Sequence, residues 1–266
     1  MLRPALAFAA WLVLSSCAMT ATVPAAARSE LAPTGTLRVG INYGNFLLVS
    51  KDQASGETRG ISVDLATELA RRLGVAFEIV AYKGAGQMAD AAAVGAWDVA
   101  FLGAEPARAN EIAFTAAYLE IPSGYLVPAG SPIRSIAEVD RDGVRVAVAA
   151  KSAYDLYLSR SLQRATLVRA EGIDASYDLF VKDKLDALAG LKPRLAADAE
   201  KLPGSRILEG SFTAIQQALG TPRARVAGAQ YLREFAEDAK ASGLVARAIE
   251  RHHVRGVNVA PMAPGG

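Results

Sequence analysis

Cysteine and histidine are nearly absent from this chain of 266 residues, which has one cysteine, Cys17, and two histidines, His252 and His253. A single cysteine excludes an internal disulfide, so packing must stabilise the folded body. Metal sites usually need clustered His or Cys ligands, and hydrolytic catalysis usually needs a histidine beside its nucleophile. Because both histidines stand at the end of the last expected helix, we predict no metal site, no cofactor and no catalytic residue.

A strong charge of either sign is also missing. The formal net charge is +2, and no cluster of lysine and arginine stands out. Nucleic-acid-binding proteins usually carry a concentrated basic surface, so nucleic acid is not an expected partner. Hydrophobic residues make up 52% of the chain, which is enough for one large core or two smaller ones.

No apolar run near the N-terminus is long enough to span a bilayer, but residues 5–14 match the apolar region of a signal peptide. Two interpretations remain open. In the first, residues 1–16 are a lipoprotein signal, Cys17 is lipidated and residues 17–35 are a tether. In the second, residues 1–27 are a signal peptide that is cleaved after Ala27. Both predict an exported, periplasmic protein, and we favour the lipid anchor because the apolar run directly precedes Cys17.

Strand and helix patterns alternate along most of the chain. Short apolar runs separated by amphipathic segments are typical of mostly parallel sheets with helices on both faces, so we predict an α/β fold. Strands are expected at residues 36–42, 76–82, 97–102, 144–149, 166–170 and 185–190, and helices at 60–74, 87–94, from 152 and at 175–182.

Residues 60–74, with the sequence GISVDLATELARRLG, carry the most specific pattern. Leu65, Leu69 and Leu73 recur every four residues on one face of the expected helix, and polar residues occupy the other face. This segment resembles the signature of the family 3 periplasmic solute-binding proteins, the receptors that feed amino acids and related solutes to ABC importers. The resemblance covers about residues 36–256.

The resemblance implies a two-lobed periplasmic-binding-protein-like fold of type II, in which two doubly wound sheets are joined by a two-strand hinge. It also implies a monomer whose partners are a small-molecule ligand and an ABC transporter permease. We assign residues 36–126 and 221–256 to the first lobe, 127–220 to the second lobe and 257–266 to a flexible tail, with hinge crossovers at 125–128 and 216–220.

Ligands of open α/β sheets bind beyond the carboxyl ends of the strands, where loops and helix N-termini converge. From the resemblance, the loop after the first strand offers Asn42 as a polar contact and Phe46 as an aromatic wall. Arg108 matches an arginine that grips a ligand carboxylate with its planar guanidinium, a geometry that lysine does not reproduce. Glu105 stands where relatives carry serine or threonine ligands, so we include it as a secondary contact.

The third segment begins at Lys151, where relatives have a turn that binds a carboxylate. Ser152, with Asp155 three residues later, has the spacing of a capping box and predicts a helix N-terminus with unpaired backbone N–H groups. Such an end attracts anions. We therefore expect Lys151 and Ser152 to contact the ligand, although Ser152 could instead only cap its helix.

The fourth segment departs from the family pattern. Amino-acid-binding relatives carry an aspartate for the ligand's ammonium group where this chain has Leu191, followed by Lys192. Leucine cannot neutralise a buried ammonium group, so either Glu105 or Asp155 supplies the negative charge from elsewhere or the ligand has no ammonium group. We favour a small organic anion over a standard amino acid, with Lys192 as a secondary contact. Two alternatives stay open on the same fold. One is a periplasmic enzyme similar to cyclohexadienyl dehydratase, with Glu105 as its acid, and the other is a sensory or docking protein without transport.

Overall fold

Parallel strands joined by helical crossovers build the first lobe. In the computed structural model, which describes residues 23–264, β1 (Thr36–Asn42) pairs in parallel with β4 (Ala76–Tyr82) and with β5 (Val99–Gly103). The crossovers contain α2 (Ile61–Leu73) and α3 (Ala85–Asp90). The leucine face of α2 is buried, and Gly74 ends the helix with a φ of 65°, as the sequence predicts.

The second lobe repeats this arrangement. β8 (Arg145–Ala149) pairs in parallel with β9 (Thr166–Ala170) and with β10 (Ala187–Leu191). Each strand is followed by a helix, and these are α4 (Ala153–Ser161), α5 (Ile173–Lys182) and α6 (Lys192–Glu200).

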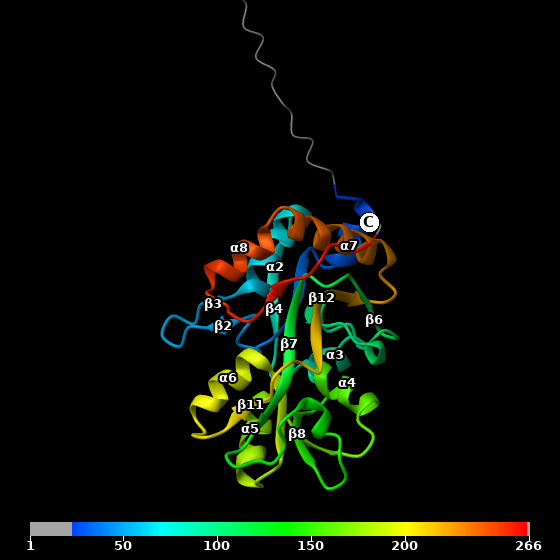
Figure 1. The fold of residues 1–266 in the computed structure, drawn as a ribbon. Helices are drawn as coiled ribbons and strands as arrows, with labels where there is room; N and C mark the ends of the chain where they lie inside the picture. Colours follow the sequence, from blue (N-terminus) through cyan, green and yellow to red (C-terminus); the bar gives the residue numbers. More distant parts are fainter. Residues whose placement is uncertain (1–22, 265–266) are drawn as a thin grey trace, which may run out of the picture.

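Two long antiparallel strands join the lobes. β7 (Leu119–Val127) and β12 (Thr213–Pro222) pair with each other, and both extend from the upper lobe into the lower one (Figure 1). Because β12 also pairs with β5 and β7 with β10, the main sheet is continuous in the order β4-β1-β5-β12-β7-β10-β8-β9. The predicted two-lobed α/β fold is confirmed, and β7 and β12 overlap both expected crossovers.

Several shorter elements accompany this main sheet. β6 (Ile112–Phe114) pairs with β12, and β11 (Arg206–Ile207) pairs with β7. A separate hairpin contains β2 (Ser50–Lys51) and β3 (Thr58–Arg59), and two short 3-10 helices are η1 (Pro106–Arg108) and η2 (Ile136–Glu138).

The C-terminal helices return to the first lobe. α7 (Val226–Ala241) and α8 (Leu244–Arg251) are separated by Gly243, which has a φ of 74°, and α8 packs on α2. His252 lies at the end of α8, and its Nε2 atom is 3.1 Å from a carboxylate oxygen of Asp64 on α2. This histidine therefore joins two helices.

Both ends of the described chain are packed against the first lobe, unlike the predicted tether and flexible tail. α1 (Ala25–Leu31) buries Ala27 and Leu31 against α7, and Glu30 accepts a hydrogen bond from the Gly228 amide at 2.7 Å. At the other end, β13 (Asn258–Val259) pairs with β7, and Lys240 donates to the Pro261 carbonyl. These backbone and apolar contacts order segments whose small, Pro/Gly-rich composition suggested mobility.

The predicted lipidation site, Cys17, lies outside the described residues. Within residues 23–264, no helix combines the length and apolar character needed to cross a membrane.

A buried ion cluster ties together the amino ends of two strands of the first lobe. Asp98 precedes β5 and is fully buried. Its carboxylate accepts hydrogen bonds from the backbone N–H and guanidinium of Arg38 on β1, and from Arg225, which precedes α7, at 2.6 Å. This cluster stands at the opposite end of β1 from Asn42.

Candidate functional site

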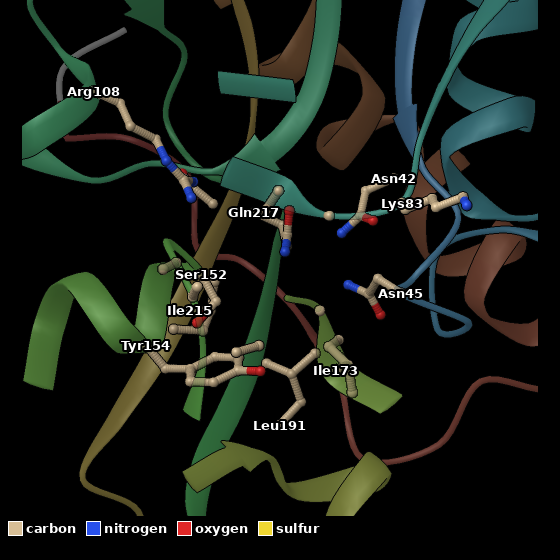
Figure 2. Close-up of a pocket in the computed structure, with 17 residues that line it drawn as sticks. Asn42, Asn45, Lys83, Arg108, Ser152, Tyr154, Ile173, Leu191, Ile215 and Gln217 are labelled. Atoms are coloured by element: carbon tan, nitrogen blue, oxygen red, sulfur yellow. The ribbon is translucent and has the colours of Figure 1, made fainter. Parts of the chain in front are cut away.

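A cavity between the lobes lies where the central strands end. The last residues of β1, β5, β8 and β10 all line it, namely Asn42, Gly103, Ala149 and Leu191, and its empty volume is about 500 Å³ (Figure 2). This is the position at which open α/β sheets bind ligands. The other lining residues are Asn45, Lys83, Gly84, Ala85, Arg108, Ala150, Ser152, Ala153, Tyr154, Gly172, Ile173, Ile215 and Gln217.

Arg108 supplies the inner positive charge of this cavity. It lies at the end of η1 and is only 6% exposed. Its guanidinium donates to the Gly103 carbonyl at 2.6 Å and to the Lys151 carbonyl at 2.9 Å. Burial lowers the pKa of Arg108 to about 10, partly offset by Glu105 and Asp90, so the group stays charged at neutral pH. The two carbonyls hold the guanidinium plane at the cavity wall, and its remaining N–H groups can donate.

Ser152 brings the N-terminus of α4 to the cavity. Its hydroxyl accepts a hydrogen bond from the Asp155 amide at 3.1 Å, which is the predicted cap. The Asp155 carboxylate in turn accepts from the backbone N–H of Lys151 at 2.8 Å, rather than from that of Ser152. Ala153 and Tyr154 form the first turn of the helix and also line the cavity, so the helix start and its backbone N–H groups are placed beside it.

Three side-chain amides line the wall that the first lobe contributes. They belong to Asn42 at the end of β1, Asn45 in the following loop and Gln217 on β12. The Asn42 side-chain oxygen accepts from the Gly44 amide at 3.0 Å, and that of Asn45 accepts from the Leu47 amide at 3.3 Å. These short loop contacts leave the two amide nitrogens as the groups available to a ligand.

The facing wall is mainly apolar. Ile173, Leu191 and Ile215 line it beside the ring of Tyr154 (Figure 2). Burial raises the pKa of Tyr154, which keeps its hydroxyl protonated as a hydrogen-bond donor. Leu191 occupies the wall where the resemblance placed an ammonium-binding aspartate. No acidic residue lines this cavity within the part of the chain that the structure describes.

The structure brings three of the seven predicted contacts to the cavity, namely Asn42, Arg108 and Ser152. Phe46 is 48% exposed and lines a separate hollow with Arg59 and His253. Lys192 donates to the Gly210 carbonyl at 2.9 Å and does not line the cavity.

Glu105 and Lys151 contact the opposite lobe instead of the cavity. The Glu105 carboxylate is 2.6 Å from the guanidinium of Arg160 on α4, and the Lys151 ammonium is 2.7 Å from the carboxylate of Asp90 on α3. Lys151 also has a φ of 53°, in the left-handed region that residues other than glycine seldom adopt. These ion pairs, with the Arg108–Lys151 hydrogen bond, hold the two lobes together beside the cavity.

We call the line of these interlobe contacts, Glu105–Arg160, Lys151–Asp90 and Arg108–Lys151, the seam. Glycine residues allow the lobes to approach closely there. A Cβ atom on Gly86 would lie 2.6 Å from the Cβ of Lys151, and one on Gly103 would lie 2.8 Å from the Cβ of Ala153. Both distances are too short for real side chains, so these positions require glycine in the observed arrangement.

Sequence reasoning missed Asn45, Lys83, Tyr154 and Gln217. Tyr154 follows Ser152 in the first turn of the predicted helix, and Gln217 lies in a predicted crossover, so the strand-end rule could have included both. Asn45 and Lys83 lie in loops whose path depends on tertiary packing. Among the described residues, no cluster of His, Cys, Asp or Glu side chains could hold a metal ion.

Several solved structures share this fold. The L-cysteine solute receptor of Neisseria gonorrhoeae is 21% identical, with 86% of this chain and 95% of that chain covered and a TM-score of 0.74. A mutant of ArgBP from T. maritima is 22% identical, with coverages of 85% and 99% and a TM-score of 0.72. An ancestral amino acid-binding protein, described as a precursor of cyclohexadienyl dehydratase, is 21% identical, with coverages of 84% and 97% and a TM-score of 0.70.

These likenesses establish the two-lobed fold alone. The comparison with curated proteins found no match. The model of the bacterial extracellular solute-binding proteins, family 3, matches residues 37–254. That match includes both lobes, the two joining strands and every residue that lines the cavity, and the chain therefore belongs to the family 3 bacterial extracellular solute-binding proteins.

Proposed function

We propose that this protein is an extracytoplasmic receptor that binds a small organic anion between its lobes and delivers it to an ABC importer by hinge closure. The observation that carries the proposal is the chemistry of the cavity wall. Arg108, the start of α4 and the amide nitrogens of Asn42 and Asn45 are hydrogen-bond donors, whereas no carboxylate lines the cavity among the described residues.

This chemistry disfavours the ammonium group of an amino acid. A cation enclosed between the lobes would need an anionic partner, because burying an unpaired charge costs several kcal/mol. Leu191 and Ile173 line the cavity, and neither can provide that charge. Both nearby carboxylates, of Glu105 and Asp155, are paired with arginines, Arg160 and Arg169.

Closure supplies the coupling to transport. A ligand that touches both lobes adds contacts only in the closed state, so it shifts the open–closed equilibrium by its difference in affinity for the two states. The cavity is lined by residues of both lobes and of β12, which extends between them. We propose that the closed form is the one that a permease recognises, and that the receptor acts as a monomer.

Isothermal titration with matched ligand pairs tests the choice of ligand. The pairs are succinate with aspartate, propionate with alanine, and butyrate with 2-aminobutyrate, which differ only by the α-ammonium group. We expect each acid to bind at least roughly tenfold more tightly than its amino acid, since 1.4 kcal/mol corresponds to a factor of ten. Tighter binding of the amino acids would overturn the anion proposal and leave the receptor function standing.

The dehydratase alternative depends on an acid in the cavity. Glu105 was its candidate, but the carboxylate is paired with Arg160 at 2.6 Å and does not line the cavity. This arrangement favours the receptor. Turnover of prephenate or arogenate by the purified protein would reverse the choice, and a sensory or docking protein without a ligand would show no ligand-induced stabilisation.

We further propose that the protein is anchored to the membrane through a lipid on Cys17. Cleavage after Ala27 would divide α1, whose Ala27 and Leu31 side chains are fully buried. Processing before Cys17 would keep this helix intact. The packing of α1 on α7 therefore supports the lipoprotein interpretation over the soluble one.

A further inference from the structure

The amide groups of Asn42, Asn45 and Gln217 converge at one place on the first-lobe wall. Figure 2 shows their side-chain nitrogens turned toward one another across the cavity. We call these three side chains the carboxamide cluster. Convergent N–H donors leave space for an acceptor that none of the three provides, and an oxygen atom is the acceptor that they fit.

The loop fixes two of these groups in the donating orientation. The side-chain oxygens of Asn42 and Asn45 each accept a hydrogen bond from the backbone N–H two residues later, at 3.0 Å and 3.3 Å. Rotating either amide by half a turn would break that bond and place its nitrogen against an N–H group. Both nitrogens therefore face the cavity before a ligand arrives, which reduces the ordering cost of binding.

Gln217 adds a third donor to the cluster. Its side chain is only 6% exposed, and its amide oxygen has no hydrogen-bond partner within the described residues. That oxygen is an acceptor without access to solvent, so the group that Gln217 turns toward the two asparagine nitrogens in Figure 2 is its amide nitrogen, which can donate to a ligand oxygen. Gln217 lies on β12, one of the two strands that join the lobes.

We infer that the carboxamide cluster is a second binding subsite, which takes an oxygen-bearing group of the ligand such as a second carboxylate. This inference rests on the proposed function, in which Arg108 and the N-terminus of α4 bind the first carboxylate. The preferred ligand class is then a small dicarboxylate. A monocarboxylate of equal length would fill only the first subsite and leave the cluster without its acceptor.

Matched pairs of acids and an isosteric variant test the inference. We would titrate the purified protein with malonate, succinate and glutarate, and with propionate, butyrate and valerate as monocarboxylates of equal carbon number. Asn45→Asp keeps the acceptor for the Leu47 amide, so the loop is retained, but it replaces the donor with a negative charge. Asn258→Asp, in exposed β13, is the control with the same change of charge.

We expect at least one dicarboxylate to bind roughly tenfold more tightly than its monocarboxylate, because the added contacts are charge-assisted. Asn45→Asp should reduce that affinity at least roughly tenfold through like-charge contact and should weaken monocarboxylate binding less, whereas the Asn258→Asp control should leave the affinity for both classes nearly unchanged. Equal affinities within each pair, or no effect of Asn45→Asp on dicarboxylates, would overturn the subsite and leave the anion receptor standing. Binding of amino acids in preference to every acid would overturn both.

Discussion

At the scale of single residues, the site depends on what each polar group is already bonded to. Asn42 and Asn45 act as donors because the loop occupies their oxygens. Glu105 and Lys151 have suitable charges for a ligand, but each is paired across the seam between the lobes. Residue type alone predicts a candidate, whereas the neighbouring hydrogen bonds decide whether the group remains available to a ligand.

Arg108→Lys tests whether the guanidinium geometry matters beyond its charge. Lysine keeps the positive charge but lacks the planar guanidinium. It cannot donate to the carbonyls of Gly103 and Lys151 and at the same time offer two parallel N–H groups to a carboxylate. We expect affinity for the preferred anion to fall roughly tenfold, or about 1.4 kcal/mol, in isothermal titration. Arg134→Lys, at an exposed position, is the matched control. Equal affinity in the Arg108→Lys variant would remove Arg108 from the binding site.

At the scale of elements, the buried ion cluster at Asp98 joins β1, β5 and the start of α7. Asp98→Ala removes an acceptor of several hydrogen bonds and leaves Arg38 and Arg225 facing each other. Breaking such a pair typically costs 3 to 5 kcal/mol, and we expect about 3 kcal/mol because both arginines partly reach solvent. Urea unfolding measures the change.

The buried ion cluster at Asp98 lies at the opposite end of β1 from the cavity. Ligand affinity should therefore change little in an Asp98→Ala protein that is still folded. Asp52→Ala, which removes a half-exposed carboxylate that accepts from two backbone N–H groups of its own loop, is the stability control and should have a smaller effect than Asp98→Ala. A large loss of affinity together with unchanged stability would contradict the structural role of Asp98.

The ion pairs at the seam predict a closure that depends on salt. Glu105→Gln keeps the side-chain shape but removes the charge that faces Arg160. Because Arg160 is 46% exposed, we expect only about 0.5 kcal/mol in favour of the open form. Small-angle scattering of the unliganded protein should show a larger mean radius of gyration in the variant.

Added salt should increase the mean radius of gyration of the parent protein more than that of the Glu105→Gln variant, because salt screens the Glu105–Arg160 ion pair, which the variant lacks. Glu78→Gln, at an exposed position on β4, is the control for the loss of one carboxylate. If the parent and the Glu105→Gln variant responded equally to salt, the pair would have no part in closure.

The regular elements could be predicted from the sequence because each rests on a local pattern. β1, β4 and β9 have the expected bounds, and Ser152 caps α4 as its spacing with Asp155 predicts. The site was predictable only in part. Phe46, Glu105, Lys151 and Lys192 follow strands as the ligand contacts do, but partners far apart in the sequence determine where they lie. Asp90 and Lys151, for example, are 61 positions apart.

At the scale of the whole molecule, one continuous sheet serves both lobes. β7 and β12 pair with each other at the centre, so bending these two strands can change the separation of the lobes without breaking either half-sheet. Both ends of the described chain, residues 23–264, lie on the first lobe, where β13 pairs with β7 and α1 packs on α7. A membrane anchor at the N-terminus would therefore attach to the first lobe and leave the second lobe to move.

This arrangement gives a prediction for N-terminal processing. If Cys17 is lipidated, the exported protein should be found in the membrane fraction with an intact mass that includes residues 17–27, and Cys17→Ala should abolish the lipid.

A chain starting at Arg28 should be less stable than one starting at Val23 by about 1 to 2 kcal/mol in urea unfolding. It would lose the buried Ala27, and the four remaining residues of α1 are too few to hold a helix that keeps Leu31 in place. Recovery of a soluble, lipid-free protein beginning at Arg28, as stable as the longer chain, would contradict both the anchor and the structural role of α1.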